Sequence, residues 1–89
     1  MLKILSTPQF DSDFKHYSAG RDIECFKQIV RLLQQQRPLP PWACDCPLVN
    51  TWGRWNCRIS FDWWLIYRCD MTANTITFEQ TGSFRYLFE

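Results

Sequence analysis

The sequence holds little of what would make the chain disordered or membrane-bound. It has only three glycines and five prolines in 89 residues, and 46% of its residues are hydrophobic, which argues against disorder and for a compact domain. No apolar run approaches the roughly 20 residues of a membrane-spanning helix, and the apolar start at Met1 to Leu5 is too short for a signal peptide. We therefore expect one domain over residues 1–89, in the cytoplasm and without a membrane partner.

Excess positive charge is also absent. Ten Lys and Arg against nine Asp and Glu leave a net charge of +1, whereas proteins that bind the RNA backbone are usually strongly basic. The C-terminal half still concentrates arginine without any lysine, so a local basic patch and a solvated mixed-charge surface are both open. These arginines are Arg54, Arg58, Arg68 and Arg85.

Histidine occurs once and cysteine five times. His16 falls in a predicted helix, and we assign it to the helix surface. An odd number of cysteines without an export signal predicts free thiols. The segment Cys44-Asp45-Cys46 does not have zinc-knuckle spacing, and no second pair completes four ligands, so we predict no metal and no cofactor. Cys57 and Cys69 lie in predicted strands, where they either approach one another across a hairpin or pack as small apolar residues.

The first half of the chain predicts a strand and two helices. After a short strand over Met1 to Leu5, Ser6-Thr7-Pro8 supplies a cap and a proline for a helix that ends at Gly20. A second helix runs from about Asp22 to about Gln36, where a proline-rich segment stops it. The two helices form a hairpin. Their apolar stripes are Phe10, Phe14 and Tyr17, then Ile23, Phe26, Ile29, Val30 and Leu33.

The second half predicts a sheet. The segment Pro38 to Thr51 has no periodicity and is expected to form a long loop. Three period-2 runs follow, Trp52 to Ser60, Trp63 to Cys69 and Thr75 to Gln80, and an antiparallel meander is their simplest arrangement. The middle run is apolar on both faces, so it lies deep in the sheet, and the helices cover one face. The predicted fold class is α+β.

The motifs of the C-terminal half resemble those of the YafQ branch of the RelE/ParE superfamily of type II toxins. The resemblance covers nearly the whole chain and implies a strand, a helical hairpin and a three-stranded antiparallel meander (β-α-α-β-β-β). The motifs that carry it are Cys46-Pro47-Leu48, Trp52, Arg58, Asp62-Trp63, Leu65-Ile66-Tyr67, Gln80-Thr81-Gly82-Ser83-Phe84 and Leu87-Phe88.

This resemblance implies a toxin that cleaves messenger RNA on the ribosome and is neutralised by a small DinJ-like antitoxin. Such cleavage needs a base, an acid and cations around the phosphate, and histidine suits the first two near neutral pH. The family's histidines and one arginine occupy the positions that match Cys46, Arg58, Gln80 and Phe84 here, while the aspartate and the final phenylalanine persist as Asp62 and Phe88. None of these histidines is present. Cys46 therefore marks a degenerate family position.

Two functions remain open. In the first, the catalytic site is degenerate, and the protein acts mainly by binding a macromolecular partner, the antitoxin or another protein, through a sheet concavity. In the second, it is an active ribosome-dependent mRNA endoribonuclease in which arginine, aspartate and tyrosine replace the histidines, with Arg58 and Asp62 as catalytic residues. We expect Arg58, Asp62, Gln80, Phe84 and Phe88 to surround the concavity. The predicted RNA- or partner-binding residues are Arg54, Trp63, Gln80, Phe84, Arg85, Tyr86 and Phe88.

Overall fold

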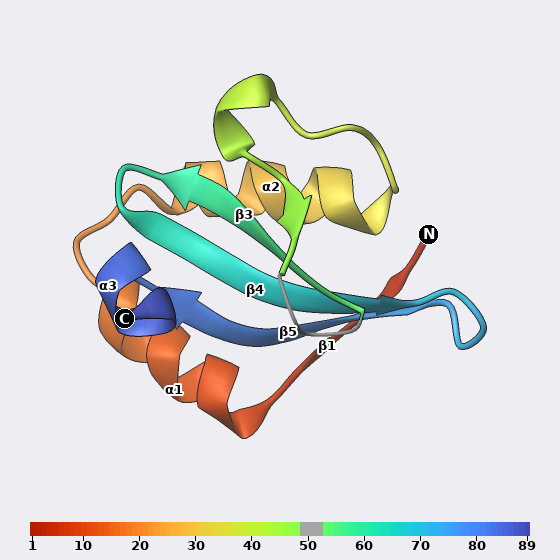
Figure 1. Cartoon of the computed structure of the whole chain (residues 1–89), viewed down its shortest axis with the longest axis horizontal. Coiled ribbons are helices and arrows are strands. Elements are labelled where there is room, and N and C mark those ends of the chain that lie inside the picture. The colour runs from red at the N-terminus through yellow and green to blue at the C-terminus, as the bar shows by residue number, and fades with distance from the viewer. Residues whose placement is uncertain (49–52) are drawn as a thin grey trace.

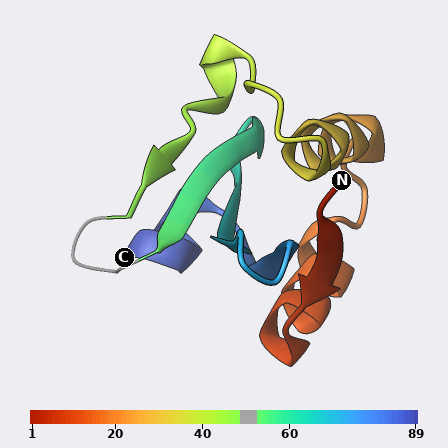
Figure 2. The same cartoon turned by 90° about the vertical axis from the view of Figure 1, so that its right-hand side faces the viewer.

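A five-stranded sheet carries two helices on one face and a short C-terminal helix against the other (Figures 1 and 2). The computed structural model describes residues 1–48 and 53–89. The strand order is β1-β5-β4-β3-β2. In chain order the elements are β1 (Lys3–Ser6), α1 (Pro8–Tyr17), α2 (Ile23–Gln34), the 3-10 helix η1 (Pro41–Ala43), β2 (Cys46–Pro47), β3 (Arg54–Ser60), β4 (Trp63–Asp70), β5 (Thr75–Gly82) and α3 (Phe84–Phe88).

Both helices of the predicted hairpin begin at a side-chain cap. The Thr7 hydroxyl accepts a hydrogen bond from the Phe10 amide at 3.0 Å, and the Asp22 carboxylate accepts one from the Glu24 amide at 3.0 Å. Helix α1 ends at Tyr17, before the predicted end, and Gly20 takes a positive φ of 75° in the turn that leads to α2. The helical hairpin is thus confirmed, with both helices slightly shorter than predicted.

The antiparallel meander of β3, β4 and β5 is confirmed. Three features were not predicted: β1 pairs parallel with β5, the two-residue strand β2 extends the other edge, and the aromatic tail forms α3. The predicted strand start at Trp52 lies outside the described residues, and β3 begins at Arg54. The last strand of the meander, β5, therefore lies beside the N-terminal strand β1. The aromatic tail that follows β5 lies beside α1.

The main core fills the space between the two long helices and the sheet. Its centre is Trp63, whose side chain is 0% exposed, stacks on Phe26 with ring centroids 5.6 Å apart, and donates from Nε1 to the Thr81 hydroxyl at 2.8 Å. Leu65 and Tyr67, on the same face of β4, join this core. Trp64, Ile66 and Arg68 lie on the other face, as the alternation predicts.

The cysteines are free thiols. Cys57 pairs in register with Leu65, and it is buried whereas Cys69 is exposed, so the strands do not bring these two thiols opposite one another. No cluster of three or more metal-binding side chains occurs within residues 1–48 and 53–89. None of the helices described is long and apolar enough to span a membrane.

Candidate functional site

The face of the sheet that points away from α1 and α2 gathers most of the predicted site residues, and we call it the open face. Strand register defines it, because cross-strand partners share a face. Arg58 lies opposite Trp64, and Ile66 is flanked by Asn56 on one side and Gln80 on the other. The open face consists of Arg54, Asn56, Arg58, Trp64, Ile66, Arg68 and Gln80, together with Glu79 at the β-bulge of β5.

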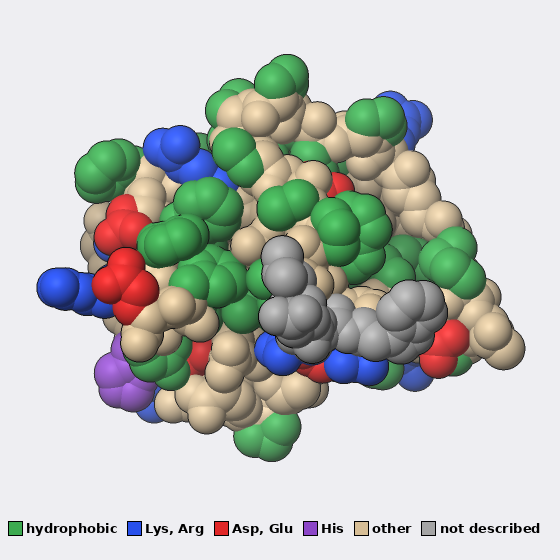
Figure 3. Space-filling model, viewed as in Figure 1, with side chains coloured by type: hydrophobic (Ala, Val, Ile, Leu, Met, Phe, Trp, Pro, Cys, Tyr) green, Lys and Arg blue, Asp and Glu red, His purple; other side chains and the backbone are tan. Residues whose placement is uncertain are grey.

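An aromatic patch formed by Trp64, Phe84 and Phe88 occupies the end of this face where α3 packs. The Trp64 ring centroid lies 5.6 Å from that of Phe84 and 6.3 Å from that of Phe88, both edge-on, and the two phenylalanine centroids are 4.9 Å apart. Phe84 nevertheless remains 45% exposed. Figure 3 shows the hydrophobic side chains that gather over β3, β4 and α3 on this side of the molecule. Such an exposed aromatic surface is suited to contact another macromolecule.

Two of the open-face arginines share one carboxylate within the protein. Glu79 places one carboxylate oxygen 2.6 Å from Arg54 Nε and the other 3.4 Å from Arg68 Nε. The Arg54 N–H does not point along the line to this oxygen, so the contact is an ion pair and not an aligned hydrogen bond. One acid therefore holds both cations, which reduces their attraction for a phosphate backbone.

Arg58 differs from these two arginines. Its Nε donates to the Ser60 carbonyl at 3.2 Å, and within the described residues no carboxylate forms an ion pair with it. The rest of the guanidinium can bind a phosphate or carboxylate, but arginine stays protonated and is a poor general base. Arg58 can thus hold an anion on the open face without activating a nucleophile.

Asp62 lies at the rim of the open face, in the turn between β3 and β4. Its Oδ1 accepts a hydrogen bond from the Phe84 amide at 3.1 Å, and its backbone carbonyl accepts one from the Tyr17 hydroxyl at 2.6 Å. Its φ of +50° places it in the left-handed region, which aspartate tolerates better than most residues. Asp62 therefore connects the sheet to α1 and α3, and this carboxylate oxygen satisfies a helix N-terminus.

The structure brings five of the predicted residues together on or beside the open face: Arg54, Arg58, Gln80, Phe84 and Phe88. Cys46 lies at the edge of the same face, where its thiol donates to the Asn56 side-chain oxygen at 3.1 Å. The prediction for Trp63 is wrong, because this side chain lies wholly in the core and cannot touch a partner. Its neighbour Trp64 takes that place, because successive side chains of β4 point to opposite faces of the sheet.

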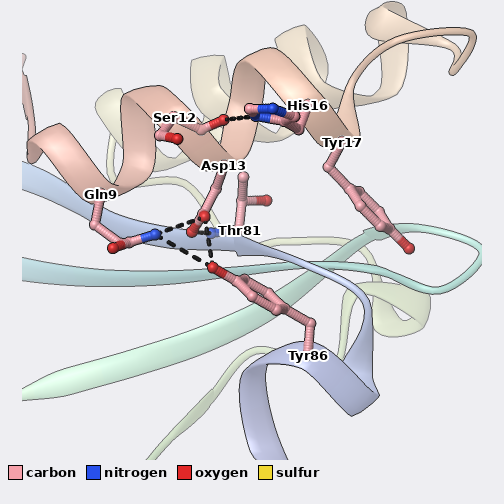
Figure 4. Close-up of a pocket in the computed structure, with 7 residues that line it drawn as sticks. All are labelled: Gln9, Ser12, Asp13, His16, Tyr17, Thr81 and Tyr86. Atoms are coloured by element: carbon pink, nitrogen blue, oxygen red, sulfur yellow. Dashed lines mark hydrogen bonds between the residues drawn. The ribbon is translucent and has the colours of Figure 1, made fainter.

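Tyr86 and Arg85 lie on other sides of α3. The Tyr86 hydroxyl donates to Asp13 on α1 at 2.7 Å, so the ring points toward α1, as Figure 4 shows. This hydrogen bond, with some burial, raises the pKa of Tyr86 and keeps the phenol protonated. Arg85 is exposed. Sequence reasoning also missed Glu79, because its two arginine partners lie on the neighbouring strands β3 and β4.

The open face offers aromatic surface and Arg58, which forms no ion pair within residues 1–48 and 53–89, but the sequence provides no imidazole there. The sole histidine, His16, lies on α1, where its Nδ1 is 2.9 Å from the Ser12 carbonyl. A family model described as YafQ, the bacterial toxin of type II toxin-antitoxin systems, matches residues 2–89. The chain belongs to the YafQ toxin family. No curated protein sequence matches it.

Solved structures of YafQ-type toxins superpose on the whole chain. A metal-bound toxin from Helicobacter pylori is 30% identical with a TM-score of 0.90, covering 99% of this chain and 100% of its own. YafQ in the DinJ-YafQ complex of Escherichia coli is 30% identical with a TM-score of 0.87, and both chains are covered completely. YafQ from Escherichia coli strain BL21(DE3) is also 30% identical, with a TM-score of 0.85 and complete coverage of both chains. The five-stranded sheet with α1, α2 and α3 is thus the YafQ toxin fold.

Proposed function

We propose that this YafQ-family protein acts mainly by binding a macromolecular partner through the open face, and that it lacks the proton-transfer chemistry of a ribonuclease. The side chains present on the open face support this proposal. Aromatic rings occupy its α3 end, Glu79 pairs with both Arg54 and Arg68, and the only histidine of the chain lies on α1. A face of this kind favours apolar contacts over a phosphate backbone.

The remaining ionisable groups are already engaged in the fold. Asp62 holds the Phe84 amide, and Tyr86 holds Asp13. A general base must be free to take a proton from the 2′-hydroxyl, and a general acid must release one to the leaving oxygen. Arg58 performs neither role well, so a ribonuclease would have to depend on positioning and charge alone.

The proposed partner is a DinJ-like antitoxin. Two structures that match this chain over its length are DinJ-YafQ complexes from Escherichia coli. In this proposal the antitoxin covers the aromatic patch, whose rings are the kind of residue that dominates binding energy at interfaces. An acidic side chain of the antitoxin would pair with Arg58, since this arginine has no described carboxylate partner.

The alternative function is a ribosome-dependent mRNA endoribonuclease. Arg58 is the observation in its favour, because an unpaired guanidinium on a sheet face can hold the scissile phosphate. In this alternative Asp62 would assist the reaction through Oδ2, because Oδ1 accepts a hydrogen bond from the Phe84 amide. The two functions therefore differ in whether the open face binds ribosomes and supports cleavage of messenger RNA.

Binding to 70S ribosomes separates the two functions, and binding to purified DinJ tests the proposed partner. We expect the protein to bind DinJ in calorimetry, and the double variant Phe84→Ala/Phe88→Ala to weaken binding by about tenfold or more. The control is Phe61→Ala, which removes a ring that is 81% exposed and lies outside the patch. Co-sedimentation with ribosomes that depends on Arg58 would favour the endoribonuclease, whether or not DinJ also binds.

A further inference from the structure

An open cavity of about 420 Å³ lies between α1, the end of β5 and α3, outside the aromatic patch (Figure 4). Phe84 and Phe88 pack on Trp64 at the open face, whereas Tyr86 on the same short helix turns into this cavity. The cavity is therefore separate from the site proposed above. Its lining includes one carboxylate, two tyrosine rings and the only imidazole of the chain.

The carboxylate of Asp13 is only 8% exposed and is held by neutral donors. It accepts hydrogen bonds from the Gln9 side-chain amide at 2.8 Å, the Tyr86 hydroxyl at 2.7 Å and the Thr81 backbone amide at 3.3 Å. No lysine or arginine pairs with it in the part of the chain that the structure describes. These donors stabilise the charge without neutralising it, and a nearly buried carboxylate gains from a cation.

The aromatic rings that line the cavity also favour a cation. Tyr17 and Tyr86 both line the cavity, and the faces of tyrosine rings attract cations. Tyr17 already does so, because the Arg21 guanidinium lies 4.0 Å from its ring centroid. A carbonyl can only accept, so the contact between His16 Nδ1 and the Ser12 carbonyl assigns the proton to Nδ1 and leaves Nε2 of the neutral ring as a further acceptor.

We propose that this cavity binds an alkylammonium group, with its charge at Asp13 and its aliphatic stem between the rings of Tyr17 and Tyr86. An ammonium group has three donors and no acceptor, which matches a site that offers acceptors and aromatic faces. A guanidinium fits less well, because its planar fork needs both oxygens of a carboxylate, and here both already accept hydrogen bonds. The group can come from a lysine side chain of a protein or from a free polyamine.

Titration of the ¹⁵N-labelled full chain with n-butylammonium, followed by NMR, tests this site. We expect saturable shifts of the Thr81 amide and of the Gln9 side-chain amide, since both donate to Asp13. Neutral n-butanol and anionic butyrate have similar stems and serve as probe controls on the wild-type protein. Equal shifts with n-butanol, or no saturable shift with n-butylammonium, would overturn the proposal even if every variant failed to fold.

Variants localise the binding. Asp13→Asn removes the charge and is expected to weaken n-butylammonium binding about tenfold or more. Tyr17→Leu removes one ring, and Asp11→Asn is the matched control, because Asp11 is an exposed acid on the same helix that accepts from Ser6. If Asp11→Asn weakened n-butylammonium binding as much as Asp13→Asn does, the effect would reflect overall charge, and the cavity would not be a specific binding site.

Two further ligands distinguish the sources. Tighter binding of N-acetyl-lysine methylamide than of putrescine assigns the cavity to a lysine of a protein, and the reverse assigns it to a free polyamine. Either result supports the alkylammonium site. Failure of both to shift Thr81 would overturn it and leave the proposed binding role of the open face untouched, since that role does not use Asp13.

Discussion

The Asp62 carboxylate accepts a hydrogen bond from the Phe84 backbone amide at 3.1 Å and so joins the β3–β4 turn to the first residue of α3. The first amides of a helix have no partner within the helix, and in α3 the Ser83 hydroxyl accepts from the Tyr86 amide while Asp62 accepts from the first one. The family's acidic position therefore has a clear structural task in this chain, which is to hold the aromatic patch in place.

Replacement of Asp62 should lower the stability of the fold, because Asp62 has a structural role. We expect Asp62→Ala to lower the free energy of unfolding by about 1 kcal/mol, since it removes a helix cap and places alanine at a positive φ. Asp62→Asn keeps an acceptor oxygen and tolerates this φ, so it should cost much less. Urea denaturation measures both. Equal stability of the two variants would show that the Phe84 contact contributes nothing.

The pairing of Glu79 with two arginines predicts a gain of RNA binding when it is removed. Glu79→Gln should release Arg54 and Arg68 and raise the affinity for single-stranded RNA about tenfold at low salt, with a steeper salt dependence. Glu89→Gln makes the same change of charge at the exposed C-terminal residue. Fluorescence anisotropy compares the two variants, and equal affinities would mean that net charge alone matters.

Gly82 is required by the position of Tyr86. A Cβ at this residue would lie 2.7 Å from Tyr86 Cδ2, and φ is +156°. We expect Gly82→Ala to lower the free energy of unfolding by about 2 kcal/mol, part of it recovered by the second substitution Tyr86→Ala. Gly20→Ala is the control for strain alone, because no atom lies within 4 Å of its Cβ position. A decrease in the free energy of unfolding no greater than that of Gly20→Ala would contradict the predicted clash between the new Cβ and Tyr86.

Thiol labelling tests the burial of Cys57. Burial, with the negative charge of Asp45 nearby, raises the pKa of this thiol, and the thiolate is the reactive form. We expect a thiol reagent at about pH 8 to label the exposed Cys44, Cys46 and Cys69 first, and Cys57 only after unfolding. Mass spectrometry of the labelled peptides identifies each site. Rapid labelling of Cys57 in the folded protein would place it outside the core.

The local elements were predictable because they follow from local chemistry. The Thr7 and Asp22 caps and the apolar stripe of Phe10 and Phe14 are encoded within a few residues of each helix. The parallel pairing of β1 with β5 was not, since it joins residues more than seventy positions apart. The five residues of α3 are too few for periodicity to indicate a helix.

The sequence indicated which segments form the site, but not the direction in which each side chain points. Trp63 and Trp64 are both apolar, and alternation places them on opposite faces without saying which face meets the helices. Tyr86 turns toward Asp13, a residue far away in sequence, so no local pattern could have removed it from the aromatic patch. Glu79 became visible only when the bulge brought its carboxylate to two arginines.

Addition of the purified protein to a translating extract shows whether the protein lacks ribonuclease activity, as we propose. The measured quantity is the length of a reporter messenger RNA on a gel, with Escherichia coli YafQ as the active reference. We predict that the messenger RNA remains intact under conditions in which the reference cleaves it. Cleavage that Arg58→Ala abolishes and Arg85→Ala preserves would contradict the account and establish the open face as a ribonuclease site.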